Sequence, residues 1–227
     1  MLNYEVDPSL LRSYVPAGTE LDFWSGKAFV SMVGFRFCRT KLFGVLPIPF
    51  HSSFEEVNLR FYVKRRAGDE ERRGVVFIRE IVPRWAIAFV ARTVYNENYV
   101  ALPMTHETRA AGDSLAVAYQ WLFKETRSSI RVEVANCETK EFCPAEGSLE
   151  QFITEHYWGY AAQTDGSCVE YRVEHPQWPV QSAHSCTFDG NVEGLYGAEL
   201  SAALKGRPNS AFLAKGSPVV VMRGRKI

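Results

Sequence analysis

The sequence lacks three features that would assign the chain to a simple class: a long hydrophobic run, an excess of one charge, and a cysteine framework. No apolar run reaches the roughly 18 residues needed to cross a bilayer. The 26 Lys and Arg residues balance the 26 Asp and Glu residues, so no bulk field attracts nucleic acid or an anionic membrane. We therefore expect neither nucleic acid nor a membrane as a partner.

The five cysteines are odd in number and scattered along the chain, at Cys38, Cys137, Cys143, Cys168 and Cys186. This spacing does not form a disulfide framework, and reduced thiols in a cytoplasm fit it best. The first residues also lack the basic and apolar regions of a secretory signal. The expected location is the cytoplasm.

The 227 residues are 46% hydrophobic and 13% aromatic, which is ordinary for a globular fold with a core. Strand patterns outnumber helix patterns, and no repeat or linker divides the chain. The sequence predicts one β-dominated α+β domain over residues 1–227. Strands are expected at 29–37, 54–63, 75–82, 115–124, 129–136, 167–175, 180–188 and 217–223, a charged turn at 67–74, and helices at 7–15, 83–95, 149–157 and 197–204.

The segment 54–63 is the most informative stretch, because its residues alternate between an apolar and a polar row. The polar row contains Glu56, Asn58 and Arg60, and the bulky side chains of Phe54 and Tyr62 lie at its two ends. A carboxylate, an amide and a guanidinium on one strand face can converge on a bound polar group inside a cleft. They can equally form a solvated exterior face, and the pattern leaves both interpretations open.

Two further charged residues, Arg79 and Glu80, interrupt the apolar strand at 75–82. One of them must face the core or its rim. If Arg79 shares a face with the polar row, we expect it to form a structural ion pair with Glu56.

Histidine and cysteine positions give little support for a metal or a nucleophile. His184 and Cys186 stand two residues apart, but a zinc site requires three or four donors at close spacing. The chain has no phosphate-binding glycine loop, dinucleotide fingerprint or nucleophile elbow. We therefore expect no metal and no cofactor.

Two histidines each follow a glutamate, in Glu155-His156 and Glu174-His175. A histidine beside a carboxylate could act in acid–base chemistry within a pocket. The alternative, which we favour, is a fixed loop with Trp178 as a core plug and structurally hydrogen-bonded histidines.

Several co-linear motifs resemble the YqjF-like proteins, a bacterial family of unknown function. They are residues 54–63, His-Pro-Gln-Trp-Pro at 175–179, and residues 210–219, with further likeness at 6–11 and 31–35. That family is similar to the acetoacetate decarboxylase-like fold, which implies a β-barrel or double sheet with a few short helices around an internal cavity.

The resemblance implies roles for particular residues. Glu56 matches a strand glutamate of the decarboxylases, and residues 91–100 match the segment that carries their Schiff-base lysine. Arg92 is retained there, whereas Tyr99 and Val100 occupy the lysine positions. Neither side chain can form an iminium, which argues against acetoacetate decarboxylase activity.

The leading hypothesis is a small-molecule-binding cavity for a polar or carboxylate-bearing ligand, with Arg60 or Arg92 as the anion clamp. The expected ligand-binding residues are Glu56, Asn58, Arg60, Arg92, Tyr99 and His175; no catalytic residue is assigned. One alternative is a structural or interaction protein with a vestigial pocket, for which a homo-oligomer would be a natural form. Another is an enzyme that uses His and Glu in acid–base chemistry.

Overall fold

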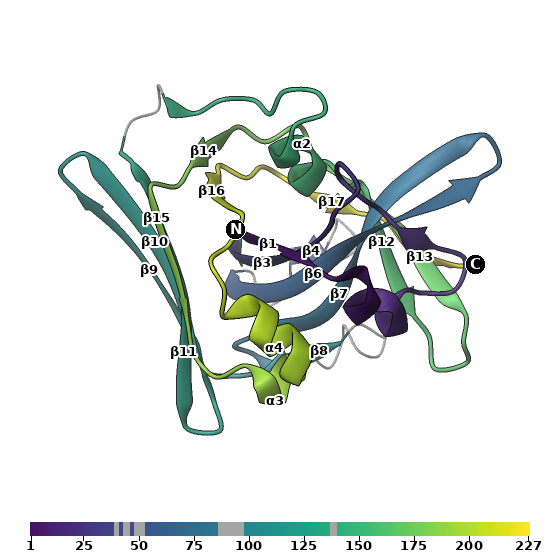
Figure 1. Cartoon of the computed structure of the whole chain (residues 1–227), viewed down its shortest axis with the longest axis horizontal. Helices are drawn as coiled ribbons and strands as arrows, with labels where there is room; N and C mark the ends of the chain where they lie inside the picture. The colour runs from purple at the N-terminus through teal and green to yellow at the C-terminus, as the bar shows by residue number, and fades with distance from the viewer. Residues whose placement is uncertain (39–40, 43–45, 48–52, 86–97, 137–139) are drawn as a thin grey trace.

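The computed structural model describes residues 1–38, 41–42, 46–47, 53–85, 98–136 and 140–227. Most of its strands belong to one large, strongly curved sheet (Figure 1). Its path runs through β14 (Val180–Ser182), β16 (Ser210–Ala214), β1 (Leu2–Val6), β3 (Ala28–Phe37), β6 (Phe54–Ala67), β7 (Glu70–Val82), β12 (Trp158–Ala162), β13 (Cys168–Glu174) and β17 (Val220–Val221). Three short strands lie off this path: β2 (Glu20–Leu21) pairs with β6, β8 (Tyr99–Ala101) with β7, and β18 (Arg225–Lys226) with β13.

A second sheet of four strands stands beside the first, at the left of Figure 1. Its order is β15 (Ser185–Asp189), β11 (Thr126–Ala135), β10 (Ser114–Phe123) and β9 (Met104–Ala111). A separate pair joins β4 (Lys41–Leu42) to β5 (Leu46–Pro47). The large sheet ends at β14 and β17 within the described part of the chain. The expected double sheet is therefore confirmed, and the term barrel describes it only loosely.

The described helices are short: η1 (Pro8–Tyr14, a 3-10 helix), α2 (Leu149–Thr154), α3 (Glu193–Tyr196) and α4 (Ala198–Leu204). Two of them begin where the capping residues predict. The Asp7 carboxylate accepts a hydrogen bond from the Ser9 amide at 2.8 Å, and the Ser148 hydroxyl accepts one from the Gln151 amide at 3.2 Å. These caps satisfy amides that the first helical turn leaves unpaired.

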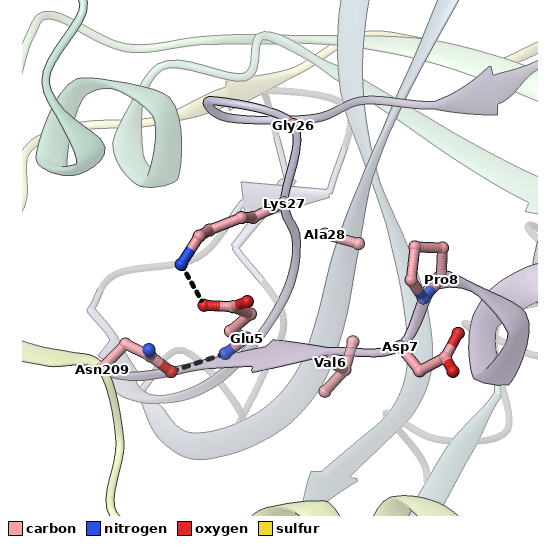
Figure 2. A pocket seen from close by; sticks show the side chains of 8 residues that line it. All are labelled: Glu5, Val6, Asp7, Pro8, Gly26, Lys27, Ala28 and Asn209. Atoms are coloured by element: carbon pink, nitrogen blue, oxygen red, sulfur yellow. Dashed lines mark hydrogen bonds and ion pairs between the residues drawn. The ribbon is translucent and has the colours of Figure 1, made fainter.

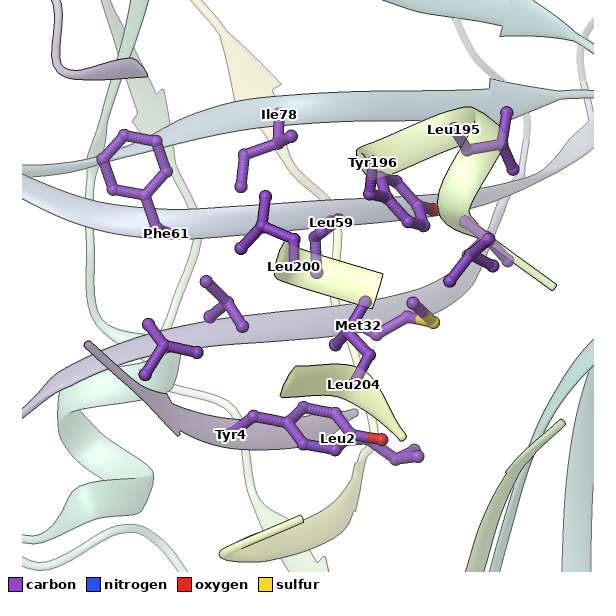
Figure 3. Packing of buried hydrophobic residues seen from close by; sticks show 14 of the residues in the cluster. Leu2, Tyr4, Met32, Leu59, Phe61, Ile78, Leu195, Tyr196, Leu200 and Leu204 are labelled. Carbon is purple, nitrogen blue, oxygen red and sulfur yellow. The ribbon is translucent and has the colours of Figure 1, made fainter. Parts of the chain in front are cut away.

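The main core lies between the apolar face of the large sheet, the second sheet, and helices α3 and α4. The apolar row of β6 lies at its centre, and Leu59 and Phe61 are fully buried there (Figure 3). Leu200 and Leu204 of α4 cover this face beside Leu2. The alternation of β6 thus gives the fold its core on one side and leaves the polar row on the other.

Most of the expected strands are confirmed, and three expectations are wrong in detail. Residues 180–188 form two strands in different sheets, because the chain turns at Ala183 and His184, whose amides donate to carbonyls of Ala211 and Glu133. The charged segment 67–74 belongs mostly to β6 and β7, and the turn narrows to residues 68–69, with Gly68 at a φ of +66°. The expected C-terminal strand at 217–223 is reduced to Val220–Val221.

The expected helix at 83–95 lies largely outside the described residues. Sequence patterns also missed β1, β9, β12 and β16, and the expected helix at 149–157 ends at Thr154. β1 carries a buried polar residue, Asn3, which breaks the apolar alternation that would have marked the strand.

Candidate functional site

The polar row of β6 faces the interior of the protein. Only 1% of Glu56 and 1% of Asn58 is exposed, Arg60 is half-buried, and Tyr62 is 1% exposed. The exterior interpretation of the row is therefore wrong. We call the residues Glu56, Asn58, Arg60 and Tyr62 the polar face of β6.

Helix α2 covers one end of the polar face. The ring of Phe152 lies 4.9 Å from that of Tyr62, and the carbonyl of Ile153 accepts a hydrogen bond from Nη2 of Arg60 at 3.0 Å. β3 and β7 pair with the two edges of β6, and the main core covers its apolar face.

Glu56 is the buried carboxyl group of this face. Its Oε1 accepts a hydrogen bond from Nδ2 of Asn58 at 3.0 Å, and its Oε2 accepts one from the Tyr99 hydroxyl at 3.1 Å. Burial raises the pKa of Glu56 to about 7, against the lowering effects of Asn58, Tyr99 and the Arg60 charge. Glu56 therefore exchanges its proton near neutral pH.

The parallel pairing of β8 with β7 brings Tyr99 to Glu56. In this pairing Tyr99 lies opposite Glu80, and Glu80 lies opposite Asn58 in the antiparallel pair of β6 and β7. Glu56 and Tyr99, which are 43 positions apart in the sequence, thus meet across the three neighbouring strands β6, β7 and β8.

Two polar atoms of this face are buried without a hydrogen-bond partner among the described residues: Oδ1 of Asn58 and Nε of Arg60. The guanidinium of Arg60 also lies over the Tyr62 ring, 5.8 Å from its centroid. One acceptor and one charge-bearing donor are therefore left unsatisfied side by side on one strand.

A buried histidine, His156, extends the polar face beyond Tyr62. Its ring lies 4.7 Å from the Tyr62 ring, and its Nε2 lies 3.1 Å from Oδ2 of Asp22. The same oxygen accepts a hydrogen bond from Nε of Arg73 at 2.6 Å. Burial lowers the pKa of His156 to about 4, although Asp22 opposes this effect.

The protonation state of this group follows from its partner. Burial raises the pKa of Asp22, but the hydrogen bonds from His156 and Arg73 outweigh it and lower the pKa overall. Asp22 is thus an acceptor, so Nε2 of the neutral histidine carries the proton. Its Nδ1 is then a buried acceptor, and no described residue donates to it.

A chain of side-chain hydrogen bonds holds Tyr62 in place. Its hydroxyl lies 2.6 Å from the Ser31 hydroxyl, which donates to Oδ1 of Asn3 at 2.7 Å. Nδ2 of Asn3 then donates to the Ser210 hydroxyl at 2.9 Å. The network joins four strands and fixes the ring between Arg60 and His156.

The structure brings together some of the residues expected to bind a ligand. Glu56, Asn58 and Tyr99 are in direct contact, and Arg60 continues the same row. Arg92 lies outside the described residues. His175 makes no described hydrogen bond to these residues: its ring stacks on Trp178 at 4.2 Å, and its Nδ1 lies 2.8 Å from the Pro176 carbonyl oxygen. Burial and, to a smaller extent, the charge of Arg60 lower the pKa of His175.

The condition for an ion pair between Arg79 and Glu56, a shared strand face, is not met. The register places Glu80 opposite Asn58 on the polar face, whereas Arg79 lies opposite Leu59 of the apolar row. The alternative in which His156 works with Glu155 is not supported by a contact between the two side chains among the described hydrogen bonds. Glu155 accepts hydrogen bonds from Gln151 and Gln177 instead.

The partner of His156, Asp22, had no recognisable sequence signal. It lies just beyond the short strand β2, 134 positions away along the chain. A contact across that distance produces no local pattern.

Two surface hollows lie away from the polar face. The first, of about 480 Å³, is lined by residues that include Glu5, Lys27 and Asn209. Figure 2 shows that its polar groups already pair with one another: Nζ of Lys27 lies 2.7 Å from Glu5 Oε2, and the Glu5 amide donates to Asn209 Oδ1 at 2.7 Å. The second, of about 380 Å³, lies between Phe123 and Glu193. Neither hollow exposes the buried polar atoms of the site.

Among the described residues, no group of three or more His, Cys, Asp or Glu side chains could hold a metal ion. No disulfide joins the described cysteines, Cys38, Cys143, Cys168 and Cys186. Within the same part of the chain, no helix is long and apolar enough to cross a membrane.

The arrangement of the sheets places the chain in the acetoacetate decarboxylase-like fold class. An acetoacetate decarboxylase from Legionella pneumophila superposes over 100% of this chain and 82% of its own, with a TM-score of 0.61 and 12% sequence identity. The enduracididine biosynthesis enzyme MppR, in a structure complexed with pyruvate, covers 99% of this chain and 86% of its own, with a TM-score of 0.64 and 14% identity. At these identities the likeness concerns the fold alone.

The sequence defines a narrower group. Residues 1–218 match the DUF2071 family, described as an uncharacterized conserved protein, and the chain belongs to this family. It is also 27% identical over 198 residues to the uncharacterized protein YqjF of Bacillus subtilis (strain 168), across 87% of this chain and 78% of YqjF. The expected family and fold are thereby confirmed.

Proposed function

We propose that the protein binds a small polar molecule bearing a carboxylate on the polar face of β6. The observation that supports this is the group of three buried polar atoms without described partners: Asn58 Oδ1, Arg60 Nε and His156 Nδ1. A buried polar atom left unpaired costs about 1–3 kcal/mol. A ligand that pairs with these atoms offsets that cost.

The polarity of these atoms defines the ligand. Arg60 supplies a donor with positive charge, suited to a carboxylate oxygen. Asn58 Oδ1 and His156 Nδ1 are acceptors, so the ligand should also carry a hydroxyl, amide or ammonium donor. A short hydroxy or amino acid meets both requirements. A fold relative has been solved in complex with pyruvate, another short carboxylate.

A second function, proton transfer by Glu56, is favoured by one observation. Its pKa of about 7 suits a group that takes up and releases a proton at neutral pH. A Schiff-base decarboxylation is not part of the proposal. That reaction requires a primary amine, whereas Tyr99 is the group in contact with Glu56, and no described lysine bonds to Glu56, Asn58 or Arg60.

The experiment is a thermal-shift and calorimetric titration with paired probes: lactate against lactamide, glycine against glycinamide, and pyruvate. Each amide keeps the shape of its acid and lacks the carboxylate charge. At a concentration of 100 times Kd, a ligand stabilises the fold by about 2.7 kcal/mol. For a chain of this size that corresponds to a rise in Tm of roughly 5–11 °C.

The variant Arg60→Met should abolish the response to the acids, and Asn58→Leu should weaken it about tenfold or more. Arg109→Met is the matched control, because Arg109 is exposed and pairs with Glu107 in the second sheet. Acids and amides that all leave Tm unchanged would refute the proposal. That result would favour a structural or interaction protein with a vestigial pocket.

A further inference from the structure

Arg79 is a half-buried cation on the apolar side of the large sheet. It lies opposite Leu59, and the register of β6 and β7 shifts between Leu59 and Arg60, so that Arg60 lies opposite Phe77. This bulge leaves Ile78 as an extra residue on β7. A bulge redirects side chains locally, which explains how a charged residue enters a face that is otherwise apolar.

No hydrogen bond or ion pair to a described residue satisfies Arg79. Its Nε is buried without a partner among the described residues, whereas the half-buried guanidinium of Arg72, on the same strand, pairs with the carboxylate of Glu170. A partly desolvated, uncompensated charge costs free energy. The described packing alone therefore does not explain why the unpaired guanidinium of Arg79 lies in an apolar face.

A second unpartnered group lies on the helix that packs against this part of β7. Helix α3 contacts β7, its Tyr196 lies beside Leu59 in Figure 3, and Tyr196, Leu195, Ile78 and Leu59 belong to the same core cluster. Tyr196 is 3% exposed, and its hydroxyl has no hydrogen-bond partner among the described residues. Burial raises the pKa of Tyr196, and the Arg79 charge is close enough to oppose that rise.

We propose that Arg79 and Tyr196 form a binding site for the carboxylate of an amphipathic small molecule, separate from the polar face of β6. A guanidinium offers donors only, and its Nε–H and Nη–H edge matches the two oxygens of a carboxylate. The tyrosine hydroxyl adds a third donor. The surrounding Ile78, Leu59 and Leu195 side chains are apolar, so the rest of the ligand should be a short alkyl chain.

The test is a calorimetric titration of the full chain with hexanoate, and with hexanamide as the neutral probe. Hexanoate should bind and hexanamide should not. Arg79→Met should weaken hexanoate binding by about 10- to 100-fold, and Tyr196→Phe by about tenfold, since each removes hydrogen bonds to a charged group. Arg109→Met is the control, because Arg109 is exposed and pairs with Glu107 in the second sheet, and it should leave hexanoate binding unchanged.

Two further readouts separate a binding role from a structural one. Without ligand, Arg79→Met should be at least as stable as the natural protein, because it replaces an unpaired cation by an apolar chain of similar length. If Arg79→Met does not fold, Tyr196→Phe still tests the site. Equal hexanoate affinity in the natural protein and both variants would overturn the proposal. Binding of inorganic phosphate or a glutamate-bearing peptide in its place would overturn the assigned ligand class.

Discussion

The buried carboxyl group of Glu56 makes the stability of the protein depend on pH in a defined direction. Its pKa is about 7 in the folded chain and 4.5 in the ordinary state. The folded state therefore binds more protons than the unfolded state between these values, and the free energy of unfolding falls as pH rises. The rise of the Glu56 pKa from 4.5 to about 7 corresponds to a full loss of about 3–4 kcal/mol in the free energy of unfolding. Below pH 4.5 the loss is absent, and above pH 7 it is complete.

The variant Glu56→Gln should remove this dependence while it keeps the local hydrogen bonds. Its amide oxygen can accept from Asn58, and its amide nitrogen can donate to the Tyr99 hydroxyl. Between pH 5 and pH 8 the stability of the variant should rise relative to the natural protein by about 2–3 kcal/mol. In Tm this is a relative gain of roughly 5–10 °C.

The measurement is urea unfolding of both proteins at pH 5, 6, 7, 8 and 9. The difference between the two proteins cancels the opposite effect of His156, whose pKa of about 4 lowers stability in acid. Glu107→Gln serves as the control, because Glu107 is exposed and pairs only with Arg109 in the described structure. A stability difference that stays constant from pH 5 to pH 9 would refute the assignment of Glu56 as a desolvated, protonatable group.

Three further predictions concern the groups around the two faces of the sheet. Asp22→Asn should destabilise the fold by about 1–2 kcal/mol, because it removes the carboxylate charge that Arg73 and His156 both contact. Urea unfolding at pH 7 measures this loss, and an unchanged unfolding midpoint would contradict the prediction. Glu170→Gln should lower the free energy of unfolding by about 3 kcal/mol, because this fully buried carboxylate pairs with Arg65, Arg72 and Arg225. Backbone amides of β18 should then exchange their hydrogens faster. Unaltered protection of β18 would contradict the role of these ion pairs. Gly159→Ala should lower the free energy of unfolding by about 1–3 kcal/mol, because an added Cβ would lie 2.1 Å from the buried Tyr171 ring. The control Gly206→Ala, whose Cβ would lie 3.4 Å from its closest neighbour, should be nearly neutral. Equal stabilities of the two variants would show that the Tyr171 ring moves aside without cost.

The sequence by itself determined the β-dominated class, the family, and the two rows of β6. These are local properties, because the side chains of a strand alternate with a period of two and capping residues act within a few positions. The same local logic predicted the starts of η1 and α2. It failed at residues 180–188, where two backbone hydrogen bonds to distant strands divide one apparent strand between two sheets.

Only the tertiary structure decided which way the polar row faces and what meets it. Alternation is identical for an interior and an exterior face, so the burial of Glu56 and Asn58 depends on the packing of elements far away in the sequence. Tyr99 reaches Glu56 through the pairing of β8, and Asp22 reaches His156 from beyond β2. Alternation alone places Arg79 and Glu80 on opposite faces, and only the register of β6 and β7 decided that Arg79 lies opposite the apolar row and Glu80 opposite Asn58. Registers and bulges arise from the sum of many side-chain contacts across the sheet, and no single segment of the chain contains that information.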